Sequence, residues 1–238
     1  FMKILSNAGY SEGECYSIIN QIGSVADSKK GYNIKTETID GKRYYVLPDG
    51  ITKVKSVTTI ISDASDKTAL LEWKKRVGEK EAQRISTQAT RRGTSVHSIA
   101  ERYVLNEDNY IKAENPFGFE SFKHIKNVLD ESVDNILGVE LGLFSKTLKT
   151  AGRTDLVAEY EGVPSIIDFK TSKKLKKEEW IESYFLQSTV YAMMFESIYK
   201  IKIPQIAILI TVDHEGIQKF VKPREEYVNK VLEIFTKQ

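Results

Sequence analysis

The chain carries two kinds of hydrophobic pattern, a helical one in its middle and a strand-like one after it. Apolar side chains that recur every three or four positions predict an amphipathic helix, at Phe119, Phe122, Ile125, Leu129, Val133 and Ile136. The period then changes, and three strands are predicted, over 139–144, 153–160 and 165–171. Glu161-Gly162 fits a turn between the last two strands. We therefore expect a three-stranded meander after the helix.

Further elements are predicted on both sides of this meander. Before it we expect a short helix, a short strand, a long helix and, after an interruption at Gly93, one more helix, over 11–24, 43–47, 67–90 and 94–105. After it we expect a helix, two strands and a closing helix that starts after Pro223, the first three over 177–198, 205–212 and 216–221. This order predicts an α/β fold with a mixed central sheet flanked by helices and an N-terminal helical extension.

Length and charge change this picture little. At 238 residues the chain fits one domain with a sizeable core, and we expect an extension over 1–55 followed by the main domain over 56–238. The formal net charge of +2 shows no overall basicity, so an anionic partner must be met by local clusters. Arg91-Arg92 and the lysines within 173–177 are candidates, although a solvated charged surface explains each cluster equally well.

Cysteine and hydropathy exclude several classes of protein. Cys15 is the only cysteine, which excludes an intrachain disulfide, a cysteine-built zinc site and an iron–sulfur cluster. No apolar run reaches the roughly 18 residues of a membrane span, and no signal segment precedes the first elements. We expect an intracellular, cytoplasmic protein with no membrane partner.

The segment around the predicted hairpin carries the candidate chemistry. Asp155 lies in the first strand of the hairpin and Asp168 ends the apolar run of the second, so both carboxylates can converge at one end of the sheet. Carboxylate oxygens are the ligands that Mg²⁺ prefers. Lys170 shares a strand face with Asp168, where it can orient or deprotonate a water, or stabilise charge on a phosphate. Taken alone, the Asp-x-Lys triplet is more often an ordinary surface pair.

Other polar residues stand at helical spacing near these strands. Gln187 and Tyr191 are four residues apart and share a helix face. His97 lies four residues before Glu101, after Gly93-Thr94, which fits a helix start where backbone N–H groups can meet phosphate. Without a motif around it, a lone histidine is more often structural than a ligand.

The order of several short blocks is more specific than any one of them. These blocks are R-G-T-x-x-H ending at His97, V-E ending at Glu140, G-R-T-D ending at Asp155, D-F-K-T starting at Asp168, and Q-x-x-x-Y from Gln187 to Tyr191. Together they resemble the RecB-type nucleases of the PD-(D/E)XK superfamily. The segment S-V-T-T-I-I at 56–61 is similar to one in the mitochondrial genome maintenance exonuclease and its phage relatives.

The resemblance implies roles for the residues that match it. It implies that the metal, Mg²⁺ or Mn²⁺, is bound by His97, Asp155, Asp168 and the backbone carbonyl of Phe169, and that Lys170 serves the attacking water. Supporting roles are implied for Glu140, Gln187 and Tyr191. DNA contacts are implied for Ser56, Thr58, Thr59, Arg92 and Arg153, although residues 56–59 equally fit a β-branched strand with no ligand.

The function implied is that of a metal-dependent DNA exonuclease acting on single-stranded ends or flaps, in DNA repair, replication or recombination. Replication or recombination proteins are the expected protein partners. Trp73, Trp180 and Tyr184 can stack on bases, although core packing is expected for at least two of them. One alternative is a structure-specific endonuclease on the same fold. The other, a non-catalytic DNA-binding module, is expected to lack an acid or the lysine, and both are present here.

Overall fold

The computed structural model describes residues 11, 31–32, 34–111 and 116–237. Its centre is an eight-stranded mixed sheet in which seven strands follow the order β1-β2-β3-β5-β6-β7-β8, and β4 pairs with β5. The strands are β1 (Lys35–Ile39), β2 (Lys42–Val46), β3 (Lys53–Ser56), β4 (Val133–Ser145), β5 (Thr150–Tyr160), β6 (Val163–Ser172), β7 (Gln205–Val212) and β8 (Gly216–Pro223).

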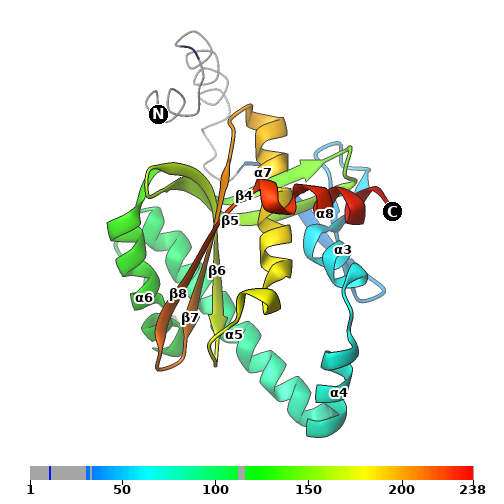
Figure 1. Cartoon of the computed structure of the whole chain (residues 1–238), viewed down its shortest axis with the longest axis vertical. Helices are drawn as coiled ribbons and strands as arrows, with labels where there is room; N and C mark the ends of the chain where they lie inside the picture. Colours follow the sequence, from blue (N-terminus) through cyan, green and yellow to red (C-terminus); the bar gives the residue numbers. More distant parts are fainter. Residues whose placement is uncertain (1–10, 12–30, 33, 112–115, 238) are drawn as a thin grey trace.

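Helices cover both faces of this sheet (Figure 1). One core cluster joins the sheet to α3 (Val57–Ala64), α7 (Glu182–Tyr199) and α8 (Glu225–Thr236). The other joins it to α5 (Glu79–Val104) and α6 (Pro116–Ser132). Two further elements are α4 (Thr68–Val77), which buries none of its residues, and the short 3₁₀ helix η1 (Glu178–Trp180). The predicted mixed sheet flanked by helices is confirmed.

The hairpin of β5 and β6 forms as the sequence predicts. Tyr160 pairs with Val163, and the two residues between them, Glu161 and Gly162, have φ values of 51° and 81°. Two consecutive positive φ angles are typical of the tight turn that suits the twist of paired strands. β7 occupies the predicted range 205–212, and α8 starts after Pro223 as predicted.

The predicted helix break at Gly93 is wrong. α5 runs through Gly93 without interruption, and the break between the two helices lies at Gly78, whose φ is 83°. A positive φ cannot continue a right-handed helix, whereas a glycine with helical angles merely lacks a side chain. As a result, Thr94 and His97 lie inside a helix of 26 residues, and the predicted phosphate-binding helix start at Gly93-Thr94 does not exist.

The amphipathic helix ends earlier than its pattern predicts. α6 stops at Ser132, and Val133 and Ile136 belong to β4. Val133 pairs with Tyr160, and Ser132 accepts a hydrogen bond from the N–H of Glu161 at 2.7 Å. Pairing with the far end of β5 therefore outweighs the helical period at these positions.

The N-terminal part of the described chain joins the same sheet. β1 and β2 lie within the predicted extension, form an antiparallel pair and connect to the sheet through β3. The helix predicted over 11–24 falls, apart from residue 11, outside the described residues. Across the described part of the chain, every helix is too short or too polar to cross a membrane.

Candidate active site

Three acidic residues occupy one row across three neighbouring strands. Glu140 and Asp155 lie opposite each other, because the paired positions Val139↔Leu156 and Leu141↔Thr154 bracket them. On the other side of β5 the last regular pair is Leu156↔Ile167, so the next step brings Asp155 opposite Asp168. Like charges placed directly across strands destabilise a sheet unless something offsets them. The fold therefore brings one carboxylate from each of β4, β5 and β6 side by side, with Asp155 in the middle.

The sheet opens at this row. β4 follows one edge of β5 along its length, so β3 and β6 share the other edge. β3 pairs with β5 only at residues 150 and 151, and β6 pairs with it only from Leu156 onward. Residues 152–155 are left between them, and the Asp155 carboxylate accepts a hydrogen bond from the N–H of Phe169 at 2.8 Å. Asp155 thus replaces a missing backbone partner at the point where β6 diverges.

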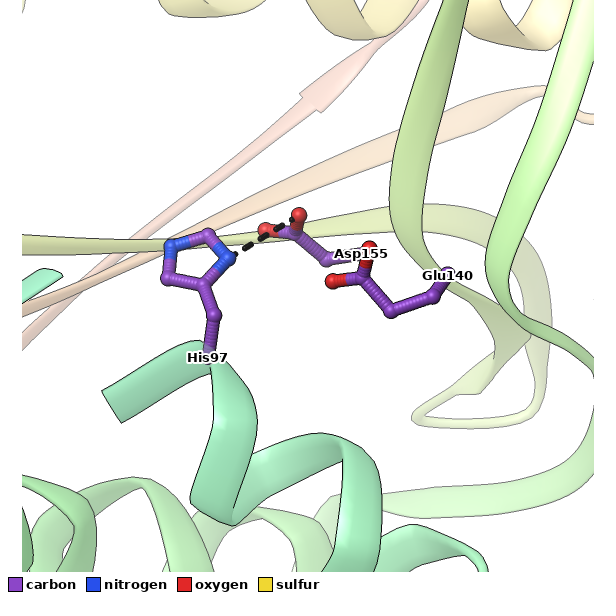
Figure 2. Close-up of side chains that lie close together, drawn as sticks. All are labelled: His97, Glu140 and Asp155. Carbon is purple, nitrogen blue, oxygen red and sulfur yellow. Dashed lines mark ion pairs between the residues drawn. The ribbon is translucent and has the colours of Figure 1, made fainter. Parts of the chain in front are cut away.

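His97 reaches this opening from α5 (Figure 2). Its Nδ1 lies 3.2 Å from Oδ1 of Asp155. One ligand atom each from His97, Glu140 and Asp155 lies within 4.8 Å of the others. Glu140 has a φ of 47°, an unusual backbone angle for a side chain of its size. This cluster of one nitrogen and two carboxylate donors matches the ligands that divalent cations such as Mn²⁺ and Mg²⁺ accept.

The protonation of this cluster follows from crowded charges in a buried place. Burial opposes a charged imidazole, yet the adjacent Asp155 carboxylate raises the pKa of His97 to about 9. Burial alone would raise the pKa of Asp155, but its contact with His97 outweighs burial and lowers this pKa below the usual value. Burial, helped by the charge of Asp155, raises the pKa of Glu140 to about 7. Without a cation, the cluster therefore keeps protons that a cation would displace.

Asp168 is held from the opposite side by a lysine and a glutamine. It is buried, with 2% of its surface exposed, and forms a short ion pair with Lys170 Nζ. The amide of Gln187 donates to its Oδ1 at 3.2 Å. Burial raises the pKa of Asp168 to about 6, although the charge of Lys170 opposes the rise. Lys170 Nζ also lies 5.1 Å from the ring centre of Tyr184.

A cleft of about 940 Å³ is lined by two of the three acids in the row, Glu140 and Asp155. Many of the residues singled out from the sequence line it, namely Ser56, Thr58, His97, Glu140, Arg153, Asp155, Gln187 and Tyr191. Asp168 and Lys170 are not among the lining residues. The two carboxylates at 155 and 168 converge as the sequence analysis expects, but the residue that completes the donor cluster is Glu140.

Some cleft residues were not found by sequence reasoning. Lys35, Arg43 and Tyr45 line the cleft from the β1–β2 hairpin, whereas Glu101, which the sequence analysis noted one turn after His97, lines it from α5. No local pattern connects this hairpin with β5, because the two come together through a short parallel pairing of β3 with β5 and the packing of Tyr45 in one core cluster with Ala151. The position of Glu140, by contrast, could have been predicted from the sequence. Glu140 lies as many residues before the β4–β5 turn as Asp155 lies after it, so the two face each other in a hairpin.

Two of the residues assigned to DNA contact do not line this cleft. Arg92 is 12% exposed and forms a short ion pair with Asp213 at the end of β7. The hydroxyl of Thr59 lies 2.8 Å from Oγ of Ser56 and donates to the carbonyl of Arg43 at 3.3 Å. Ser56 itself caps α3, since its Oγ accepts the N–H of Thr59 at 3.1 Å. Residues 57–59 therefore form the first turn of a helix, not a strand.

The glycine of the G-R-T-D block has a packing role. A Cβ at Gly152 would lie 2.6 Å from Cε1 of Tyr191. The ring of Tyr191 thus approaches the backbone of β5 beside the cleft, and only a residue without a side chain leaves room for it. Burial raises the pKa of Tyr191 well above its usual value, so its hydroxyl stays protonated.

The aromatic residues considered for stacking are more exposed than expected. Trp180 is 61% exposed and has Lys177 Nζ 5.4 Å from its ring centre. Trp73 lies on α4, which has no buried residue, and Tyr184 packs partly buried against a core cluster. The expectation that at least two of the three belong to the core is wrong.

Comparison with known proteins places these features in a family. A family model described as the PD-(D/E)XK nuclease superfamily matches residues 62–238. A solved structure described as a "Putative exonuclease" from Eubacterium rectale is similar, with 14% identity, a TM-score of 0.44, and coverage of 62% of this chain and 64% of that one. Another, SSO0001, has 13% identity and a TM-score of 0.32, with 60% and 75% covered. The chain thus spans less than two thirds of the first structure. No curated protein matches it.

Proposed function

The chain belongs to the PD-(D/E)XK nuclease superfamily, and on this premise we propose that it is a divalent-metal-dependent DNA exonuclease acting on single-stranded ends or flaps. The observation that carries the proposal is the row Glu140, Asp155 and Asp168 beside a cleft, with His97 paired to Asp155 and Lys170 paired to Asp168. Metal-dependent phosphodiester hydrolysis uses clustered carboxylates to hold the metal ion, with a further cationic side chain nearby.

We assign the metal to His97, Glu140 and Asp155, whose donor atoms already lie close together. Asp168 and the carbonyl of Phe169 are the further ligands proposed from the family resemblance. When bound, Mg²⁺ or Mn²⁺ would polarise the scissile phosphate and make a bound water more acidic. The cluster suits this purpose because mutual repulsion between Glu140 and Asp155 favours a cation between them.

The remaining residues position the reacting groups. Lys170 is held by Asp168, so its ammonium is fixed beside the row of acids, where it can orient the attacking water and stabilise charge on the phosphate. Gln187 fixes the other oxygen of Asp168. Tyr191 packs against Gly152 and supports the strand that carries Asp155. Each of these contacts restricts the position of a side chain or strand that takes part in the reaction, and such fixed positions favour catalysis.

The cleft has the charge and the hydroxyls that a DNA strand needs. Lys35, Arg43 and Arg153 provide cations, and Ser56 and Thr58 provide hydroxyl groups that can contact phosphate. Trp180 does not line the cleft, but its exposed ring is available for the stacking that is typical of single-strand binding. The segment 56–61 supports a place among the relatives of the mitochondrial genome maintenance exonuclease, and with it a role in DNA repair, replication or recombination alongside proteins of those processes.

One experiment tests the activity and its mode. Linear and circular single strands and blunt duplex, each labelled, are incubated with Mg²⁺, Mn²⁺ or chelator. We expect linear single strands to be shortened from an end in either metal, with no cleavage in chelator or by Asp155→Asn. Cleavage of circles would indicate an endonuclease, and binding without cleavage in any metal would indicate a DNA-binding module.

A further inference from the structure

A second cavity lies on the other side of α5 from the cleft. It has a volume of about 790 Å³, within the range of roughly 300–1,000 Å³ typical of pockets for small organic groups. Its walls come from α5, α6, the residue after β6 and the turn after β7. Gln88, Ala89, Arg91 and Arg92 line it from α5, while Gly93 and His97, which follow on the same helix, line the active-site cleft. The two hollows are therefore neighbours separated by one helix.

The cavity combines cations with an exposed aromatic ring. Arg91, Arg92 and Lys173 line it, and Arg91 and Lys173 form no ion pair within the described part of the chain. Its two acids are already paired, Asp213 with Arg92 and Glu120 with Lys123. Phe117 lines the cavity from the first turn of α6 with 75% of its surface exposed. An anionic group with a flat apolar part suits this lining best.

Arg92 ties α5 to the end of β7 at the wall of the cavity. Its guanidinium pairs with Asp213, which also donates its N–H to the carbonyl of Ser172 at 3.1 Å. Nε of Arg92 is buried and has no hydrogen-bond partner. On the other wall, Gly118 packs so closely on α5 that a Cβ there would lie 2.1 Å from Oγ of Ser95. The cavity is thus held between elements that are tied together.

The chain itself connects the cavity to the chemistry. Lys173 lies five residues after Asp168, just beyond the end of β6. At about 3.3 Å a residue along a strand, the two residues are at most roughly 17 Å apart. A strand of a few nucleotides covers that distance. A single strand that follows β6 from the row of acids can therefore reach the cavity. The cations and the aromatic ring of the cavity have no use in the hydrolysis itself.

We propose that this cavity binds a nucleotide of the single-stranded DNA substrate away from the cleaved bond, with its phosphate on Arg91 and Lys173 and its base against Phe117. The inference rests on the proposed function and extends it, because it adds a second contact site to the same strand. It makes affinity depend on substrate length, since a strand too short to span both hollows gains nothing from the cavity.

The test measures affinity against length. Fluorescent single strands of about 3, 6 and 12 nucleotides, the span over which a binding site of this kind is filled, are titrated with the full chain in chelator at several salt concentrations. We expect wild type to bind longer strands more tightly. Arg91→Ala with Lys173→Ala should bind the longest strand at least about tenfold more weakly and lower the salt slope by about 1.4, two phosphate contacts at roughly 0.7 each. Phe117→Ala should lose about fivefold or more through lost stacking.

Lys202→Ala is the matched control, an exposed lysine that lines neither hollow. The inference is overturned if the cavity variants bind strands of every length with the same affinity as the control variant. If wild type then still degrades DNA with metal, only the cavity assignment is lost. If wild type neither binds nor cleaves any strand, the proposed function fails together with the inference.

Discussion

Glu140 and Asp155 stand opposite each other across β4 and β5, with their donor atoms in one cluster with His97. Two carboxylates in this position repel each other, and the raised pKa of Glu140, about 7, is the result of burial and of the charge of Asp155. The positive φ of Glu140 adds backbone strain at the same residue. A cation bound between the two carboxylates would offset their repulsion, and its binding energy would also compensate for the backbone strain at Glu140.

Glu140→Gln should therefore weaken metal binding, because the amide keeps the shape of the side chain but removes its charge. We expect a loss of about 10- to 100-fold in Mn²⁺ affinity, measured by calorimetry in the absence of DNA. Glu101→Gln is the control, because Glu101 lines the same cleft outside the donor cluster. Equal affinities of the two variants would show that Glu140 does not touch the metal.

The contact between Asp155 and His97 can be tested without any metal. Asp155 is the group that raises the pKa of His97 to about 9 against the effect of burial. Asp155→Asn should therefore lower that pKa markedly, observed as a shifted titration of one imidazole signal in NMR spectra. The chain has three histidines, and the two other signals are an internal control. An unchanged titration would mean that the pair does not form in solution.

Lys170→Ala should reduce the rate of cleavage more than the binding of DNA. Its ammonium is fixed beside Asp168 and is proposed to act on charge that develops during hydrolysis. We expect the single-turnover rate at saturating DNA to fall about 100- to 1,000-fold, with little change in Kd. A variant that loses affinity but keeps its rate would make Lys170 a phosphate-positioning residue.

The metal-free protein should lose stability as pH rises. Folding raises the pKa values of Asp168, Glu140 and His97 to about 6, 7 and 9. A group whose pKa is higher in the folded than in the unfolded state stabilises the fold fully when the pH is below its unfolded-state pKa. This stabilisation is lost as the pH rises through its folded-state pKa. From about pH 5 to 9.5, Tm in chelator should therefore fall.

Added Mn²⁺ should have the opposite dependence on pH. Protons and the cation compete for His97 and Glu140 in the donor cluster, so the increase in Tm caused by Mn²⁺ should become larger as pH rises. Thermal denaturation at each pH, with chelator and with Mn²⁺, measures both effects. An increase that stays constant across the range would contradict the assignment of the metal to this cluster.

Gly152→Ala should disturb the fold at the site, because its Cβ would lie 2.6 Å from the buried ring of Tyr191. We expect a loss of about 1–3 kcal/mol in the free energy of unfolding, measured with urea. Gly93→Ala is the control, since a Cβ there meets nothing and a helical alanine is favoured by roughly 0.5–1 kcal/mol. A neutral Gly152→Ala would mean that Tyr191 is free to move.

Short-range patterns were enough to predict the centre of the fold. The turn at Glu161-Gly162, the strand of β7 and the helix after Pro223 depend on a few adjacent residues and on apolar alternation. The convergence of Asp155 and Asp168 follows from that hairpin alone. The break at Gly93 was mispredicted because a glycine permits a positive φ without requiring one, and here the required one is at Gly78.

The sequence by itself determined which acids, lysine and histidine are present and which of them share a hairpin, because strand alternation and tight turns are local. Only the tertiary structure decided that Glu140 completes the donor cluster, that Lys35 and Arg43 line the cleft, and that Arg92 faces a second cavity. These positions depend on strand register and on pairings between distant segments, above all β3 with β5. Such pairings are stabilised by burial over the whole sheet, and no short stretch of residues contains that information.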